Sequence, residues 1–179
     1  MLFQDGALFS SLSVAQNIMV PMREHTDLPA EEQEAVAAMK LALAGLPPDT
    51  GAKFPSELSG GMVKRAALGR ALALDPRILF LDEPTSGLDP LIASGIDTLI
   101  VKLNQGLRIT VVLVTHDLTT LFTMCDRIAV LVDGKITVDT LGNLMQSDQP
   151  WIHEFFHGPR AEGAKRGAIA SRKRDHGDG

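Results

Sequence analysis

Residues 77–89 read RILFLDEPTSGLD, and this stretch decides the fold of the chain. Its run of apolar residues, without alternation, predicts a strand buried on both faces, as in a parallel sheet covered by helices. Two adjacent carboxylates, Asp82 and Glu83, close the strand. Burying such a pair is costly unless partners compensate. A divalent metal and a water fit this need, because one carboxylate can hold the metal while its neighbour orients or deprotonates the water.

This pattern is typical of the Walker B element of a nucleoside triphosphatase. A plainer interpretation is a strand that runs into an acidic surface turn. A lone Asp-Glu pair does not separate the two interpretations, so the other motifs of the chain have to decide.

The composition is that of an ordinary globular protein, with 45% hydrophobic and 22% charged residues among 179. The net charge of −5 gives no reason to expect nucleic acid as a partner. A single cysteine, Cys125, excludes an internal disulfide and fits a reducing compartment. No apolar run approaches the ~20 residues that cross a bilayer. We therefore expect a cytoplasmic protein whose contact with a membrane comes only through a partner.

Periodicity and breaker residues predict the remaining elements. Two helices are expected within residues 13–46, the first capped by Ser13 and interrupted at Pro21. A third should run from the glycines of residues 58–62 to about Leu74, with Ala66, Ala67, Ala71 and Leu74 in the core and Lys64, Arg65 and Arg70 in water. After the central strand we expect a helix from Pro90 to about Asn104, which Gly106 breaks, then a strand over Ile109–Thr115 and a helix over Leu118–Met124. A hairpin of Ile128–Val132 and Lys135–Val138 should follow, and then short helices over Leu141–Gln146 and Trp151–Phe156.

Residues 158–179 have no apolar period, and their basic residues outnumber their acidic ones by 6 to 3. We expect them to form a disordered, solvated tail.

Three further features accompany the central strand. Ser59 precedes Gly60 and Gly61 at a helix start, where bare N–H groups and the helix dipole favour an anion; a simple serine cap is the alternative. His116 follows a strand, and ligands of open α/β sheets bind beyond the carboxyl ends of strands, although a lone histidine is more often structural. Gln4 stands at the edge of what looks like the end of a strand, where its amide could reach a metal or a water.

In this order, the motifs resemble those of the ATP-binding-cassette (ABC) ATPases over about residues 1–145. The resemblance implies an α/β fold, a partial RecA-like P-loop NTPase core with a parallel sheet and a helical subdomain over about residues 13–75, all within an ATPase domain of residues 1–157. It also implies ATP and Mg²⁺ as cofactors, a homodimer of ATPase subunits and a transmembrane permease as partner, with no nucleic acid.

The resemblance assigns a role to each motif residue. Gln4 resembles the Q-loop glutamine, which contacts the metal and the attacking water. Ser59, Gly60 and Gly61 resemble the signature loop, which binds the γ-phosphate of ATP held by the opposite subunit. The remaining assignments are Asp82 as the magnesium ligand, Glu83 as the catalytic carboxylate, Asp89 as the D-loop aspartate and His116 as the switch histidine, which serves both catalysis and nucleotide binding.

Met62 stands where the family signature usually has glutamine. With residues 1–9 and 21–26, it makes the chain similar to the ATPase subunits of Mla-type phospholipid transporters, the group that includes toluene-tolerance systems. That resemblance implies lipid movement between the two membranes of a Gram-negative envelope, with the protein peripheral at the inner membrane.

The sequence contains no G-x-x-x-x-G-K-[ST] phosphate loop (Walker A). Family order places that loop upstream of Gln4, so we expect a truncated or mis-started chain that is inactive alone, while the intact protein is an ATPase. Two alternatives stay open. One is a non-hydrolysing fragment that binds a permease or a complete ATPase subunit, and the other is an ABC ATPase with another task, such as solute import or Fe–S assembly.

Overall fold

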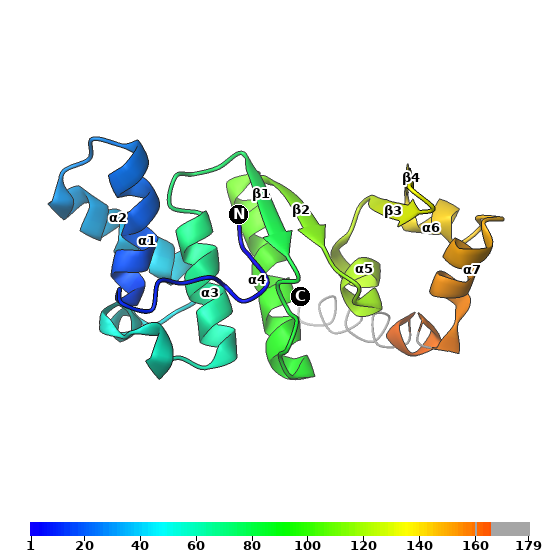
Figure 1. The fold of residues 1–179 in the computed structure, drawn as a ribbon, viewed down its shortest axis with the longest axis horizontal. Helices are drawn as coiled ribbons and strands as arrows, with labels where there is room; N and C mark the ends of the chain where they lie inside the picture. Colours follow the sequence, from blue (N-terminus) through cyan, green and yellow to red (C-terminus); the bar gives the residue numbers. More distant parts are fainter. Residues whose placement is uncertain (160, 166–179) are drawn as a thin grey trace, which may run out of the picture. The chain divides into compact units, whose positions relative to one another are not determined.

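The computed structural model describes residues 1–159 and 161–165, which form parts of two compact units. The first unit is Met1–Val114 and the second begins at Thr115. Figure 1 shows the order of the elements along the chain. Each unit is described by itself below.

The first unit begins with three helices that pack on one another. They are α1 (Val14–His25), α2 (Ala30–Leu43) and α3 (Gly60–Ala71), with short 3₁₀ turns at Pro48–Ala52 and Pro55–Glu57 before α3. Ser13 caps α1 as predicted, in a reciprocal capping box with Gln16. Val14, Ile18, Met22, Leu41 and Ala66 are among the residues that form the apolar core between these helices.

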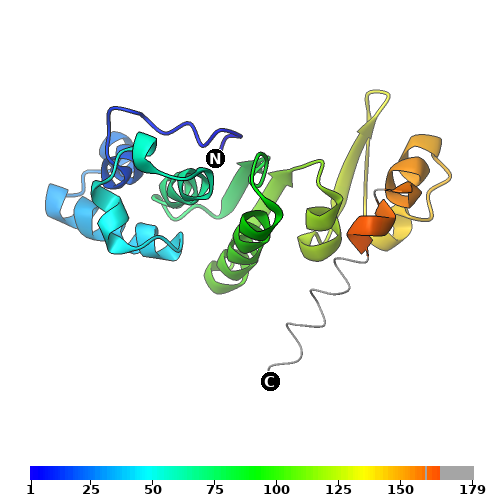
Figure 2. The ribbon, with the colours of Figure 1, turned by 90° about the horizontal axis from the view of Figure 1, so that it is seen from below.

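The parallel pair of strands follows, with a long helix between them. β1 (Ile78–Asp82) pairs with β2 (Thr110–Val114), and α4 (Pro90–Leu107) connects them. Leu2 forms an isolated parallel bridge to Leu81 on the other side of β1, so the segment expected to be a strand end pairs with β1. Figure 2 shows α4 on one face of the strand pair.

The expectation that β1 is buried on both faces is wrong for the described residues. Leu79 and Leu81 are each 1% exposed, whereas Phe80 is 48% exposed. Ile78 of β1 and the outward side chains of the neighbouring segments continue this exposed face; the latter are Met1, Phe3, Val112 and Val114. Within the first unit, helices bury only one of the two faces.

Two predicted helix breakers do not break their helices. Pro21 lies inside α1, although an interior proline costs about 3 kcal/mol. Ile18 and Met22, on either side of it, are almost fully buried, and each contributes roughly 1.5–3 kcal/mol, so tertiary packing outweighs the lost hydrogen bond. Gly106 lies inside α4, which ends at Leu107 and is capped by Arg108, a residue with a left-handed φ of 53°.

The orientation predicted for α3 is also partly wrong. Ala66 and Ala67 are buried as expected, but Leu74 is 42% exposed and Lys64 is only 6% exposed. Arg65 and Arg70 are half-buried and donate hydrogen bonds to backbone carbonyls.

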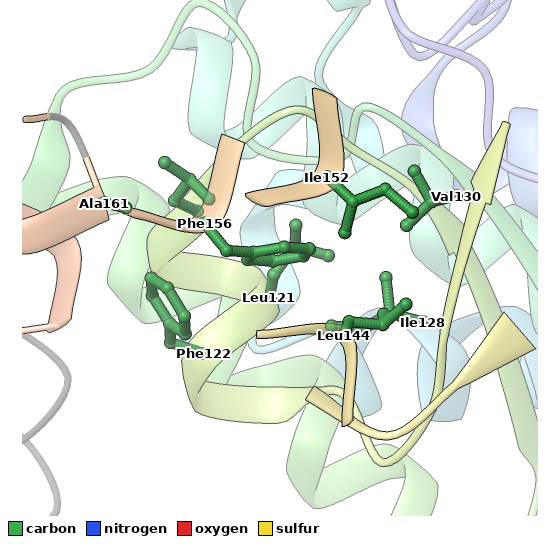
Figure 3. Close-up of a cluster of buried hydrophobic side chains, with 9 residues drawn as sticks. Leu121, Phe122, Ile128, Val130, Leu144, Ile152, Phe156 and Ala161 are labelled. Atoms are coloured by element: carbon green, nitrogen blue, oxygen red, sulfur yellow. The ribbon is translucent and has the colours of Figure 1, made fainter. Parts of the chain in front are cut away.

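The second unit is built from short elements around its own core. They are α5 (Leu118–Met124), β3 (Ile128–Val132), β4 (Lys135–Asp139), α6 (Leu141–Leu144) and α7 (Pro150–His157). The strands form the predicted hairpin, with Asp133 and Gly134 both left-handed in the turn. Figure 3 shows the core, in which Leu121 and Phe122 of α5 meet Ile152 and Phe156 of α7.

Part of the expected tail is helical instead. Residues 161–165 are in helical conformation and Ala161 is buried in the core of the second unit, because small and apolar side chains there complete its packing. Residues 160 and 166–179 of the predicted tail lie outside the described residues.

Candidate functional site

The carboxyl ends of neighbouring parallel segments bring three of the predicted residues to one edge of the sheet. The N–H of Leu2 donates to the carbonyl of Phe80 over 2.8 Å, and the N–H of Asp82 donates to the carbonyl of Leu2 over 2.9 Å. Gln4 therefore follows its segment at the same edge at which Asp82 and Glu83 end β1. This is the edge at which ligands bind in open α/β sheets.

The backbone of Glu83 is held in an unusual conformation. Its φ is +45°, in the left-handed region that non-glycine residues rarely adopt. The N–H of Glu83 donates to the carbonyl of Val114 over 2.9 Å, and its own carbonyl accepts from Lys64 Nζ over 3.1 Å and from the Ser86 N–H over 3.2 Å. Such conformations cost about 1–3 kcal/mol and persist where surrounding bonds determine them, typically at functional sites.

The donors at this edge fit a magnesium ion. Asp82 is half-buried and Gln4 is exposed, so a carboxylate and an amide oxygen are available from adjoining strand ends. Mg²⁺ prefers such oxygen ligands and usually takes only one or two from protein, with waters and phosphates as the rest. No group of three or more His, Cys, Asp or Glu suited to a metal occurs among the residues that the structure describes.

A second group of predicted residues lies where α3 and α4 begin. Ser59 caps α3, with its hydroxyl accepting from the Met62 N–H, and both Ser59 and Gly60 are exposed. Gly61 is buried against α4: a Cβ built on it would lie 2.6 Å from Ile92 Cγ2. The glycine pair therefore has a packing role in addition to leaving N–H groups open at the helix start.

Asp89 is the N-cap of α4. Its Oδ1 accepts from the N–H groups of Leu91 and Ile92, each over 3.1 Å. The structure thus gives this carboxylate a helix-capping role. Its predicted contact with nucleotide stays a prediction.

His116 belongs to the second unit, where it is exposed in the turn between β2 and α5. The residues on either side fix this turn: the Asp117 N–H donates to Thr115 Oγ1 over 3.0 Å, and Asp117 caps α5 by accepting from the Thr119 N–H. The backbone at His116 is therefore ordered locally. Its predicted role as the switch histidine stays a prediction.

Sequence reasoning missed Lys64, the cation that contacts this edge of the sheet. Its Nζ donates to the carbonyls of Gln4 and Glu83. Burial lowers the pKa of Lys64 from its ordinary value, while the negative charges of Asp5, Glu83 and Asp82 act in the opposite direction. A signal was present, because Lys64 lies three residues after the buried Gly61 and four before the buried Leu68, on one face of α3.

Two more residues that sequence reasoning missed hold the loop after Gln4. Arg70 donates to the carbonyls of Gly6 and Ala7, each over 2.7 Å. The buried amide of Asn17 accepts from the Phe9 N–H over 2.8 Å and donates to the Phe9 carbonyl over 3.1 Å. A polar residue inside an apolar helix face was the available signal for Asn17.

A protein-family model for ABC transporters matches residues 1–86. Together with the parallel sheet, the strand-end carboxylates and the Ser59-capped helix that begins with two glycines, and with the matches described next, this places the chain in the family of ABC transporter ATP-binding proteins.

Curated relatives match most of the chain. The intermembrane phospholipid transport system ATP-binding protein MlaF of Haemophilus influenzae is 42% identical over 159 residues, covering 88% of this chain and 60% of that protein. MlaF of Escherichia coli K12 is 42% identical over 161 residues, covering 88% and 59%. The probable ribonucleotide transport ATP-binding protein mkl of Mycobacterium tuberculosis H37Rv is 42% identical over 160 residues, covering 89% and 44%. The chain spans about three fifths of the length of its MlaF relatives.

Solved structures with the same fold are ABC cassettes. The cassette MJ0796, in a dimeric post-hydrolysis state bound to ADP and Pi, has a TM-score of 0.69 at 34% identity, covering 78% of this chain and 61% of that one. CbiO1 of Clostridium perfringens, part of an ABC transporter complex, has a TM-score of 0.72 at 29% identity, covering 92% and 66%. No helix among the described residues is both long and apolar enough to cross a membrane.

Proposed function

We propose that this chain is the part of an ATP-hydrolysing ABC subunit that contains the catalytic carboxylate, the Q-loop glutamine and the signature loop. The intact subunit hydrolyses ATP, and its energy drives phospholipid transport across a Gram-negative envelope. The single observation that carries the hydrolytic role is the left-handed Glu83 beside Asp82, whose backbone bonds to the Val114 carbonyl of β2 and to the Lys64 side chain of α3.

The chemistry follows from this placement. Glu83 orients and deprotonates the water that attacks the γ-phosphate in line, and the Gln4 amide helps to position that water. Asp82 and Gln4 would hold Mg²⁺, which neutralises charge on the phosphate oxygens when bound. His116 would hydrogen-bond the terminal phosphate as negative charge develops.

The signature loop would contact ATP that is bound to another subunit, so the complete site requires two subunits. The signature loop of Ser59, Gly60 and Gly61 binds the γ-phosphate of ATP that is held by the phosphate loop of a partner subunit. Asp89 contacts the nucleotide from the same subunit as the signature loop. The packing of Gly61 against Ile92 supports this arrangement, because it fixes the signature loop to the start of α4. The dimeric state of the MJ0796 cassette is a further support.

The test of hydrolysis is the substitution Glu83→Gln in a version of the protein that includes the phosphate loop. We expect ATP turnover to fall by at least about 100-fold, since the amide cannot accept the water proton, while ATP still binds. Steady-state kinetics and equilibrium binding of a fluorescent ATP analogue measure the two effects.

Asp133→Asn is the matched control, because Asp133 is also an acid with a left-handed φ, in the turn of the β3–β4 hairpin. We expect its turnover to match that of the unsubstituted protein. Near-normal hydrolysis by Glu83→Gln would contradict the assignment of Glu83.

The phospholipid substrate is supported by the two MlaF relatives, whose names state this task. The mkl relatives, at the same identity, carry the name of a ribonucleotide transporter, so the substrate needs its own test. A permease supplies the membrane span, and the ATPase would lie at the cytoplasmic face of the inner membrane.

The substrate test uses the complete transporter in vesicles. We expect ATP-dependent transfer of a fluorescent phospholipid to acceptor vesicles, and loss of this transfer with Glu83→Gln. Uptake of a labelled ribonucleotide without lipid transfer would contradict the phospholipid proposal and favour the second candidate.

A further inference from the structure

One side chain of α3 joins two segments of the candidate site. Lys64 Nζ donates to the carbonyl of Gln4, just after the bridge between Leu2 and Leu81, and to the carbonyl of Glu83, just after β1. These two residues come from chain segments about 80 positions apart. An ammonium group has three donors, so a single lysine can hold both carbonyls at once.

Lys64 occupies a place where a positive charge is otherwise unfavourable. Lys64 is only 6% exposed, and burying its ammonium group costs free energy unless hydrogen bonds and nearby negative charges compensate. Both compensations are present: the two carbonyls accept its protons, and Asp5, Asp82 and Glu83 contribute negative charge. A neutral apolar side chain would pack without this cost but would remove a donor from both carbonyls, and the Glu83 carbonyl would then keep the bond from the Ser86 N–H.

A second cation on α3 fixes the loop that follows Gln4. Arg70 donates to the carbonyls of Gly6 and Ala7. Gly6 lies directly on α3, since a Cβ built on it would come within 3.0 Å of Val63 Cγ1. Gly6 and Ala7 both have positive φ, so this turn has a backbone shape that its α3 contacts maintain.

The same helix begins at Ser59, Gly60 and Gly61. The loop after Gln4, the strand end with Glu83 and the glycine loop are therefore all attached to one 12-residue helix. One helix therefore supports all three segments of the candidate site.

We propose that Lys64 is a positioning residue, which sets the backbone of Gln4 and of Glu83 relative to each other and to the start of α3. This inference rests on the proposed ATPase function. The Glu83 carbonyl is next to the torsion that directs its carboxylate, and a misplacement of about 1 Å at a reacting group can cost about 100-fold in rate. Lys64 acts through these two residues and does not itself contact the substrate.

The experiment compares three variants of the protein at its full natural length. Lys64→Met removes the charge and the donors at similar side-chain volume, and Lys64→Arg keeps both. Arg65→Met is the matched control: Arg65 is the next residue of α3 and also donates to two carbonyls, but those are the carbonyls of Ala44 and Gly95.

Two readouts separate positioning from general stability. The first is the kcat and the KM for ATP. The second is amide hydrogen exchange by mass spectrometry, in peptides covering residues 1–8 and 80–86, and in peptides of α2 as reference. Exchange reports on the backbone whether or not the protein hydrolyses ATP.

For Lys64→Met we expect kcat to fall at least about 10-fold with KM changed by less than about 3-fold, because only the transition state needs the exact placement. Exchange in both site peptides should become at least about 10-fold faster, with α2 unchanged. Lys64→Arg should recover most of both readouts. Arg65→Met should keep normal kcat and speed exchange near Ala44 and Gly95 instead.

An unchanged kcat in Lys64→Met, or faster exchange that is equal in all peptides, would overturn the proposal. So would an Arg65→Met variant that loses kcat to the same extent. If Lys64→Met does not fold, Lys64→Gln takes its place, and a kcat equal to that of the unsubstituted protein would overturn the proposal. If the unsubstituted protein hydrolyses no ATP, the proposed function fails, and exchange alone decides the role of Lys64.

Discussion

Glu83 adopts a backbone conformation that glycine and asparagine accept more readily than glutamate does. Ala7, in the loop after Gln4, is another non-glycine residue of this kind. Strain of this kind at Glu83 is offset by bonds from Val114, Ser86 and Lys64, which come from three different segments. The conformation therefore depends on tertiary structure. The sequence predicts that Glu83 ends a strand, but it does not predict the left-handed backbone of Glu83, because the bonds that hold it come from other segments.

Asp89 illustrates a residue with two possible roles that a substitution can separate. Asp89→Ala should lower the free energy of unfolding by about 1 kcal/mol, because the N–H groups of Leu91 and Ile92 lose their acceptor. Asp89→Asn should change it by less than about 0.5 kcal/mol, since asparagine caps equally well. Chemical denaturation measures both. An equal loss of stability in the two variants would contradict the capping role.

The same pair of variants tests the predicted nucleotide contact of Asp89. In the full-length protein, a lower kcat or a higher KM for ATP in Asp89→Asn, at unchanged stability, would indicate a role beyond the cap. Normal kinetics in Asp89→Asn would limit Asp89 to capping α4.

At the level of elements, the contact between α3 and α4 depends on the absence of a side chain at Gly61. Gly61→Ala should lower the free energy of unfolding by about 1–3 kcal/mol, because the new methyl group would overlap Ile92 Cγ2 and a β-branched side chain cannot turn away freely. Urea denaturation measures the loss.

Gly60→Ala is the control for the Gly61 prediction. A Cβ there would lie 3.3 Å from Leu88 Cδ2, the far end of a flexible side chain, so we expect little loss or a gain from better helix propensity. The Ile92→Ala substitution should recover at least about 0.5 kcal/mol in the Gly61→Ala background. Additive effects of Gly61→Ala and Ile92→Ala would contradict direct overlap.

Elements with strong local signals were predictable, and those decided by packing were not. The capping box at Ser13 and the Asp-Gly turn of the β3–β4 hairpin have the predicted form because a few neighbouring residues determine each. Pro21 failed as a breaker because burial of Ile18 and Met22 against the neighbouring helices compensates its local cost, and Gly106 also lies inside its helix. Lysine side chains are usually solvated, and this general tendency predicts an exposed Lys64. Its position on the buried face of α3 instead places it in the interior.

At the level of the molecule, the sheet of the first unit has an apolar face that no helix of that unit covers. Phe80 and Val112 lie side by side on this face, in register across β1 and β2, and both are exposed. Uniformly apolar strands predict burial on both faces, and the relatives are longer proteins than this chain. Exposed apolar strands of this kind favour association with other molecules.

The last prediction follows from that face. In the 179-residue chain, Phe80→Lys should reduce self-association at equal concentration, as measured by light scattering, because a charge interrupts the exposed apolar surface. The free energy of unfolding should change by no more than about 0.5 kcal/mol, as for other exposed positions. Leu81→Lys, one position further along β1, is the control and should prevent folding, since Leu81 is 1% exposed.

In a protein of the relatives' full length, we expect Phe80→Lys to cost several kcal/mol, about the penalty for a charge forced into a core, because additional chain would cover this face. Equal scattering by the two 179-residue proteins would contradict an aggregation-prone face, and an equally small cost in the longer protein would contradict its burial there.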